Sequence, residues 1–243
     1  MNYPDNPNYN LMCYVCLHRM IVHGATDILV LYEDSFPKIA QRFAKLPNVN
    51  LEIRKGITYK GPGSDHFNIR FKLPNLASLD FEYIFIDSDM YVIADLDQLW
   101  KLRHDKPWIG INHQRIPQWP DTHRKPFLNS GLQIVSDPKF YDHAAITACH
   151  RKAGNQYAVP GRDQALLFRY FKSIGYDYTH AQVGPEWNSC ALVGRLTKKE
   201  KWVGRTTGLA QNHPIYINHY WCSNKPWQIK CPLHKAYKDK KVL

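Results

Sequence analysis

Two carboxylates stand close together in the middle of the chain, in Asp87-Ser88-Asp89, directly after the aromatic and β-branched run 83–86. Such a run, bounded by charge, predicts a strand buried on both faces. Ligands of open α/β sheets bind beyond the carboxyl ends of the strands, which is where this tripeptide would lie. Alternate residues of an extended chain face the same way, so Asp87 and Asp89 could approach one hard cation that clamps a phosphate. A strand followed by a helix-capping Asp is an equally simple interpretation of the tripeptide.

A second apolar run, 90–93, follows the tripeptide and leads into an acidic helix start, ADLDQLW at 94–100. In this succession the chain resembles the nucleotide-sugar-dependent glycosyltransferases of the GT-A fold, and most closely the glycogenin-like enzymes of glycosyltransferase family 8. They share a hydrophobic strand, Asp-x-Asp (the DXD motif), a second hydrophobic strand and then Ala-x-(Ile/Leu)-Asp-x-Leu. The resemblance implies that the chain is a metal-dependent hexosyl- or pentosyltransferase, with a UDP-sugar as the expected donor and retention of configuration.

The rest of the chain alternates between strands and helices. We expect helices over 10–23, 35–46, 66–79 and 137–153, and a further helix opened by 161–167. Strands are expected over 27–32, 49–54, 108–112 and 215–219, with another after 127–131. A repeated strand–helix–strand succession favours a mostly parallel central sheet flanked by helices, an α/β fold. Neither an internal repeat nor a linker interrupts 1–243, so we expect a single GT-A catalytic domain.

The first strand of such a domain is expected to be short or truncated, because only Asn2-Tyr3-Pro4 precedes the turn-rich segment ahead of the first helix. In the family this strand lines the uracil pocket, and a loop Asn-x-x-Tyr follows it. Asn6-Pro7-Asn8-Tyr9 fits that loop, which implies that Tyr9 stacks on the base. The alternative is a tyrosine that packs at a helix start.

Two further stretches resemble the donor-binding parts of the family. Arg70 lies on the helix before the Asp-x-Asp strand, where the family carries a basic residue that reaches the donor, and Lys72 is its rival. Asn129-Ser130-Gly131 resembles the family's Phe-Asn-Ser-Gly, with one residue inserted after Phe127. Asn129 can hydrogen-bond a sugar hydroxyl, and Gly131 lets the backbone come close. An exposed basic helix residue and an ordinary Asn-Ser-Gly turn are the alternatives.

Asp163 and Gln164 begin a stretch that matches the family's Asp-Gln-x-x-Leu at the floor of the sugar pocket. They are the candidate catalytic residues, since they could orient the sugar or stabilise the positive charge of an oxocarbenium-like state. N-capping of a helix would also explain Asp163. Pro185-Glu186-Trp187-Asn188 resembles a family phrase that leads toward the last strand, although a core tryptophan explains it nearly as well.

The last strand ends at His219, which five residues separate from Lys225-Pro226-Trp227, the family's register. The resemblance implies that His219 joins Asp87 and Asp89 as the third metal ligand and that Lys225 contacts the diphosphate. A structural histidine is the alternative. Cys222 stands where the family has a glycine whose backbone approaches the β-phosphate, so the pyrophosphate loop could be displaced. A histidine ligand favours Mn²⁺ over Mg²⁺.

The amino-acid composition limits the kinds of partner that the chain is expected to bind. The formal net charge of +11, from 32 Lys and Arg against 21 Asp and Glu, favours anionic partners such as nucleotide diphosphates. A basic stripe with interleaved aromatic residues is not recognisable, so we expect no nucleic acid, and a metal-dependent nucleic-acid-binding protein ranks last. A catalytically inactive sugar-nucleotide-binding protein is the nearer rival. The acceptor could be a glycan, a protein or a lipid-linked sugar.

The six cysteines are widely scattered, which favours reduced thiols. A zinc site from Cys13, Cys16, Cys222 and Cys231 is a minor alternative, because the first two fall among apolar residues of a predicted helix. No apolar run is long enough to span a bilayer, and residues 1–10 lack the form of a signal peptide. We therefore expect a soluble, cytoplasmic chain.

Overall fold

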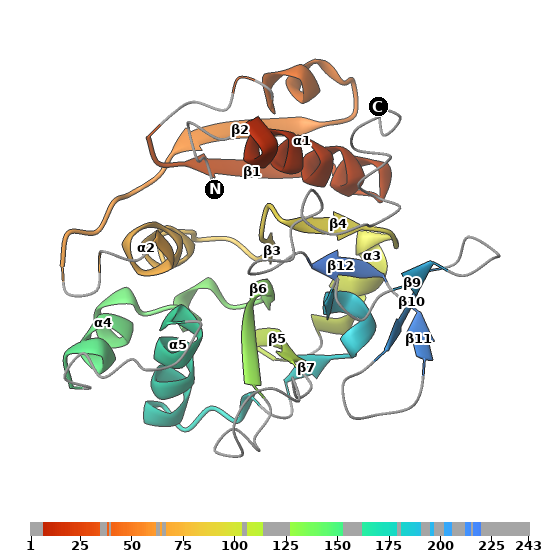
Figure 1. The fold of residues 1–243 in the computed structure, drawn as a ribbon. Helices are drawn as coiled ribbons and strands as arrows, with labels where there is room; N and C mark the ends of the chain where they lie inside the picture. The colour runs from red at the N-terminus through yellow and green to blue at the C-terminus, as the bar shows by residue number, and fades with distance from the viewer. Residues whose placement is uncertain are drawn as a thin grey trace.

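Strands and helices alternate along the chain in the computed structural model, shown in Figure 1. It describes residues 7–34, 38, 40–61, 64, 67–103, 106–113, 127–152, 162–178, 181–190, 195–196, 202–205, 212–214 and 216–219. The helices are α1 (Pro7–Val22), η1 (Ala40–Lys45), η2 (Asn68–Lys72), α2 (Leu73–Leu76), α3 (Leu96–Trp100), η3 (Lys101–Arg103), η5 (Pro138–Phe140), α4 (His143–Lys152), α5 (Arg162–Ser173) and η7 (Pro185–Asn188). None of the described helices combines the length and the apolar character needed to cross a bilayer.

The strands form four hydrogen-bonded groups. They are β1 (Asp27–Tyr32), β2 (Asn50–Lys55), β3 (Tyr83–Ile86), β4 (Met90–Val92), β5 (Trp108–His113), β6 (Phe127–Val135), β7 (Gln182–Val183), β8 (Ser189–Cys190), β9 (Arg195–Leu196), β10 (Trp202–Arg205), β11 (Asn212–Pro214) and β12 (Ile217–His219). Their orders are β1-β2, β3-β6-β5-β7, β4-β12-β8 and β11-β10-β9. Parallel pairs join β1 to β2, β5 to β7 and β8 to β12, and the other pairs are antiparallel.

The four-stranded sheet has an apolar core on each face because its side chains alternate. Trp108 and Val135 point to one face, where they join Phe171 of α5 in a core that α4 also contributes to. Their neighbours Ile109 and Ile134 point to the other face and pack in a second core with α3 and β12. Apolar packing on both faces therefore holds the sheet in place. It also fixes the positions of the strand ends, which the polar residues follow.

Antiparallel pairing brings the last described strand to the middle of the chain. β12 pairs with β4 so that His219 lies opposite Met90 and Asn218 opposite Tyr91. On its other side β12 runs parallel to β8, with His219 opposite Cys190. All residues of β12 are buried, and Ile217 has no exposed surface. This pairing places His219 beside the segment that holds Asp87 and Asp89, although about half the sequence separates them.

Most predicted elements are present. The strands 27–32 and 83–86 have the expected bounds, and α1 starts a few residues before the helix predicted over 10–23. Within the helix expected over 35–46 the structure describes only η1, and within 66–79 a π-helical turn leads into α2, which carries Pro74 in its first turn. The turn interpretation of Asn129-Ser130-Gly131 is wrong, because these residues lie inside β6. The expected short first strand lies outside the described residues.

Candidate functional site

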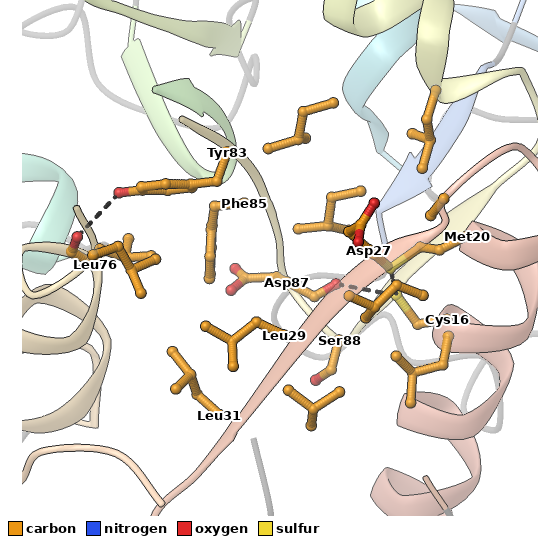
Figure 2. Close-up of a pocket in the computed structure, with 18 of the residues that line it drawn as sticks. Cys16, Met20, Asp27, Leu29, Leu31, Leu76, Tyr83, Phe85, Asp87 and Ser88 are labelled. Atoms are coloured by element: carbon orange, nitrogen blue, oxygen red, sulfur yellow. Dashed lines mark hydrogen bonds between the residues drawn. The ribbon is translucent and has the colours of Figure 1, made fainter. Parts of the chain in front are cut away.

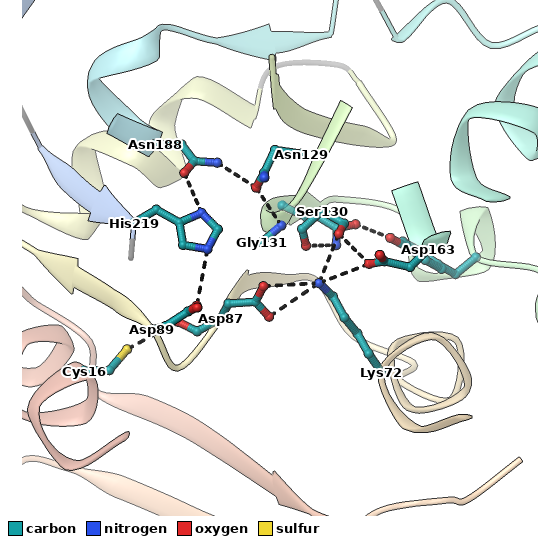
Figure 3. A network of polar contacts seen from close by, with 12 residues as sticks. Cys16, Lys72, Asp87, Asp89, Asn129, Ser130, Gly131, Asp163, Asn188 and His219 are labelled. Atoms are coloured by element: carbon teal, nitrogen blue, oxygen red, sulfur yellow. Dashed lines mark hydrogen bonds and ion pairs between the residues drawn. The ribbon is translucent and has the colours of Figure 1, made fainter. Parts of the chain in front are cut away.

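Three potential metal ligands meet at the carboxyl end of β3. Ligand atoms of Asp87, Asp89 and His219 all lie within 4.8 Å of one another (Figure 3). The Asp87 amide donates to the Gly131 carbonyl at 2.8 Å, and the Met90 amide donates to the Asp87 carbonyl at 3.1 Å, so a tight turn joins β3 to β4. Asp89 and His219 are 4% and 3% exposed. The prediction that Asp-x-Asp follows a strand and meets His219 therefore agrees with this arrangement.

A chain of hydrogen bonds fixes the orientation of the His219 ring. The Gly131 amide donates to Asn129 Oδ1 at 2.9 Å, and Asn188 Nδ2 donates to the same oxygen at 2.8 Å. Because Nδ2 of Asn188 points to Asn129, its Oδ1 is the atom that faces His219 Nδ1, at 2.9 Å. An amide oxygen only accepts, so Nδ1 carries the proton. The direction of these hydrogen bonds, which starts at the Gly131 backbone N–H, therefore determines which nitrogen of the neutral ring carries the proton.

This tautomer leaves His219 Nε2 with a lone pair that faces a carboxylate. Nε2 lies 3.3 Å from Asp89 Oδ1, inside a buried site. Two acceptors at that distance repel each other unless a cation, either a proton or a metal ion, lies between them. A metal-ligating histidine commonly donates its other N–H to a carbonyl-type oxygen that sets its orientation, the part that Asn188 plays here. The donor set thus fits a divalent cation.

Lys72 connects the carboxylate cluster to the start of α5. Its ammonium lies 3.4 Å from both carboxylate oxygens of Asp87, 3.2 Å from Ser130 Oγ and 3.5 Å from Asp163 Oδ2. It is 5% exposed and also lies 4.6 Å from the Phe85 ring centroid. Burial raises the pKa of the Asp87 carboxyl, and the Lys72 ammonium beside it acts in the opposite direction. A buried cation thus lies between the partly buried carboxylate of Asp87 and the buried carboxylate of Asp163, with Ser130 as a further partner.

The two candidate catalytic residues lie in the first turn of α5. Asp163 is the second residue of this helix, and its carboxylate accepts a short hydrogen bond from Ser130. Asp163 Oδ1 and Gln164 Oε1 are both buried and accept no hydrogen bond from any described residue. Buried acceptors of this kind are costly unless a ligand or water satisfies them. Donors such as the hydroxyl groups of a sugar would satisfy them.

Some predicted site residues lie elsewhere. Arg70 forms a bidentate ion pair with Glu33 at 2.6 and 2.9 Å, and it also donates to the Ser64 carbonyl at 3.3 Å. The structure therefore brings Lys72, and not Arg70, to Asp87. Ser88 lies in the turn between Asp87 and Asp89 and lines a cavity of about 550 Å³ beside β1 and β3 (Figure 2). Tyr9 falls in α1, but its side chain is outside the described residues.

The expected diphosphate-binding residues Cys222 and Lys225 also lie outside the described residues, as do two of the four cysteines of the zinc alternative. The other two, Cys13 and Cys16, lie in α1, where burial raises the pKa of both thiols. A raised pKa disfavours the thiolates that zinc requires. Asn188 is the positioning residue that sequence reasoning missed. Its only signal was its place in the phrase 185–188, three residues after a proline.

Comparisons with known proteins identify the fold. No protein-family model matches the chain, and no curated protein matches it in sequence. Crystal structures of the glycosyltransferase GlyE from Streptococcus pneumoniae TIGR4 are similar, with a TM-score of 0.62 and 16% identity for the apo form and 0.63 and 14% for a second structure. Both matches cover 97% of this chain and 58% of the GlyE chain.

Mouse xyloside xylosyltransferase 1 in its apo form is also similar, with a TM-score of 0.55 and 12% identity over 89% of this chain and 93% of that chain. At such low identities the likeness shows the fold. The α/β, GT-A-like fold class predicted from the sequence is therefore confirmed. This chain spans little more than half the length of GlyE.

Proposed function

We propose that the chain is a metal-dependent glycosyltransferase that moves a sugar from a nucleotide diphosphate, most simply a UDP-sugar, to a hydroxyl acceptor with retention of configuration. One observation carries this proposal: His219 Nε2 lies 3.3 Å from Asp89 Oδ1, and ligand atoms of these two residues and Asp87 lie within 4.8 Å of one another at the end of a central strand. The likeness to solved glycosyltransferases supports it. The order of motifs along the chain supports placement in glycosyltransferase family 8.

Asp87, Asp89 and His219 would hold the metal. Two carboxylates and one imidazole nitrogen suit Mn²⁺ better than Mg²⁺, which prefers oxygen ligands alone. When bound, such an ion neutralises the negative charge that gathers on the departing diphosphate. Asn188 keeps the imidazole in the ligating orientation through its bond to Nδ1. Lys225 and Cys222 belong to the proposal as diphosphate contacts on resemblance alone.

The remaining polar residues would hold the sugar. Lys72 is an ammonium donor beside both Asp87 and Asp163, so it can bridge the metal side and the sugar side of the site. Asp163 Oδ1 and Gln164 Oε1 are acceptors for sugar hydroxyls. In a dry site, the Asp163 carboxylate would also stabilise the positive charge of an oxocarbenium-like state. Burial of these groups excludes the water that would otherwise hydrolyse the donor.

The test is hydrolysis of a panel of nucleotide sugars, with and without Mn²⁺, by the chain and its Asp89→Asn variant. We expect slow release of nucleoside diphosphate from one donor, lost on chelation and lost in the variant. Asp97→Asn is the matched control, because Asp97 is an exposed carboxylate on α3 and should leave turnover unchanged. Metal-dependent binding of a nucleotide without turnover of any donor would instead favour a non-catalytic sugar-nucleotide-binding protein.

A further inference from the structure

β6 bulges where it reaches the candidate site. Its pairing with β5 is in register up to Ile109 and resumes at Ile111, so Gly110 alone lies opposite the four residues 130–133 of β6. On the other side of β6 the register with β3 is continuous. Extra residues on one strand of an antiparallel pair bend that strand, and such bulges redirect side chains next to active sites. The bulge therefore changes the surroundings of residues 130–133 on the β5 side.

The bulge takes the Ser130 carbonyl out of the pairing between β5 and β6. Consecutive carbonyl groups of a strand point to opposite sides of the strand. The Gly131 carbonyl accepts from the Asp87 amide at 2.8 Å, on the β3 side, so the Ser130 carbonyl points to the β5 side. There the side chain of Gln133 takes the place of a strand partner, because its Nε2 donates to the Ser130 carbonyl oxygen at 2.7 Å.

Two donors in the core fix the orientation of the Gln133 amide. Trp108 Nε1 donates to Gln133 Oε1 at 2.9 Å, and the Tyr141 hydroxyl donates to the same oxygen in a short hydrogen bond. Burial raises the pKa of this hydroxyl, so it keeps its proton. An indole N–H only donates, so the atom that it meets is the amide oxygen, and the amide NH₂ group faces Ser130. A Cβ atom at Gly110 would overlap the indole ring, so the glycine opposite the bulge makes room for this donor.

The side chain of Ser130 then joins the two polar halves of the site (Figure 3). Its hydroxyl donates a short hydrogen bond to Asp163 Oδ2 and accepts from the Lys72 ammonium at 3.2 Å. An ammonium only donates, so the single hydroxyl proton goes to the carboxylate. The bond at Oδ2 sets the plane of the carboxylate. It thereby sets the direction of Asp163 Oδ1, which accepts no hydrogen bond from any described residue.

We propose that Gln133 is a positioning residue of the candidate sugar site. It closes the bulge at the Ser130 carbonyl, and the Ser130 hydroxyl in turn sets the direction in which Asp163 Oδ1 meets the sugar. Gln133 has no exposed surface, and its partners Trp108 and Tyr141 belong to a core of apolar residues. A buried amide in such surroundings is costly unless it is fully hydrogen-bonded, as this one is. The catalytic consequence rests on the proposed function, whereas the link between Gln133 and Ser130 does not.

A double-mutant cycle of Gln133→Met and Ser130→Ala tests the link by denaturant unfolding without metal or nucleotide. Methionine fills a similar volume and suits the core, but it has no N–H for the Ser130 carbonyl. If Gln133 holds Ser130, Gln133→Met should lower the folding equilibrium constant at least about fivefold less in the Ser130→Ala chain than in the parent chain. Leu76→Met, in the same core, is the matched control and should have the same effect in both chains.

Steady-state kinetics of donor hydrolysis test the consequence for the site. Gln133→Met should lower the turnover number by about 10- to 100-fold, because a small misplacement of groups at the reacting centre has effects of this size. The affinity for UDP with Mn²⁺ should stay unchanged, because the three candidate metal ligands lie outside the bulge. In the Ser130→Ala chain, Gln133→Met should lower turnover by at most about twofold more, since residues that act as a unit are not additive.

Free energies of unfolding that add, or losses of turnover that multiply, would overturn the proposal, because Gln133 would then act independently of Ser130. If Gln133→Met does not fold, Tyr141→Phe replaces it in the unfolding cycle, since it removes one of the two donors that orient the amide. A coupling to Ser130→Ala of the same sign is then expected, and additive effects would again overturn the proposal. If the parent chain hydrolyses no donor, the proposed function fails, whereas the unfolding cycle still decides whether Gln133 holds Ser130.

Discussion

Replacing Gly131 with alanine should disturb the candidate metal site through direct contact. A Cβ atom at this position would lie 2.6 Å from Cε1 of His219 and 2.9 Å from Cε of Met90. Ordinary contacts begin near 3.4 Å, so the imidazole would have to retreat by about 0.8 Å. Met90 can rotate, but the Asn188 hydrogen bond and the surrounding core restrain the ring.

A displacement of this size exceeds the roughly 0.5 Å within which a working site must be held. We therefore expect Gly131→Ala to weaken Mn²⁺ binding by about 10- to 100-fold, the usual effect of disturbing the groups around a ligand. Overpacking should also lower the free energy of unfolding by about 1–3 kcal/mol. Calorimetric titration with Mn²⁺ in the presence of UDP measures the first effect, and thermal melting measures the second.

The matched control is Gly175→Ala, at a turn after α5 where φ is +69° and no atom lies within 4 Å of the added Cβ. Its strain should cost about 1–2 kcal/mol of stability with no change in Mn²⁺ affinity. If Gly131→Ala melts at a lower temperature but binds Mn²⁺ as tightly as the parent chain, the inference that this glycine sets the space for His219 is refuted.

Four further substitutions test other parts of the site and fold. Lys72→Gln should lower the rate of donor hydrolysis by about 100-fold, because it removes a buried cation at the reacting centre. Arg70→Gln should leave the turnover number nearly unchanged. Steady-state kinetics of donor hydrolysis by the two variants measure this difference. Asn188→Ala should weaken Mn²⁺ binding by about 10- to 100-fold because it releases His219, as titration would show, and an unchanged affinity would count against the orienting role. Leu166→Ala, at a residue with no exposed surface, should cost about 2–5 kcal/mol in denaturant unfolding, and a smaller loss would mean that α5 is loosely packed.

Sequence patterns predicted the elements that depend on local hydrophobic order. The runs 27–32 and 83–86 are strands with the predicted bounds, but most of their residues are half-buried and not fully buried as the apolar runs predicted. Asn129-Ser130-Gly131 has the composition of a turn, yet these residues lie in a strand. Pairing of β6 with both β3 and β5 outweighs that local preference, and only the tertiary structure supplies the pairing.

The sequence could not show whether Arg70 or Lys72 lies beside Asp87, and the reason is geometric. Arg70 and Lys72 lie two positions apart on η2. A π-helical turn changes the angle between successive side chains from that of an ordinary helix. Glu33 attracts one of them and Asp87 the other, which depends on where β1 and β3 end. The meeting of His219 with Asp87 and Asp89 came from family resemblance, since no periodic pattern relates residues so far apart.

The central claim is that Asp87, Asp89 and His219 hold a cation that binds a nucleoside diphosphate. Its most direct test is calorimetric titration of the chain with UDP, with Mn²⁺ and with a chelator in its place, repeated on His219→Ala. We predict that Mn²⁺ tightens UDP binding at least about tenfold and that the variant loses this gain. UDP affinity that is the same with and without the metal, or no binding in either condition, would contradict the account.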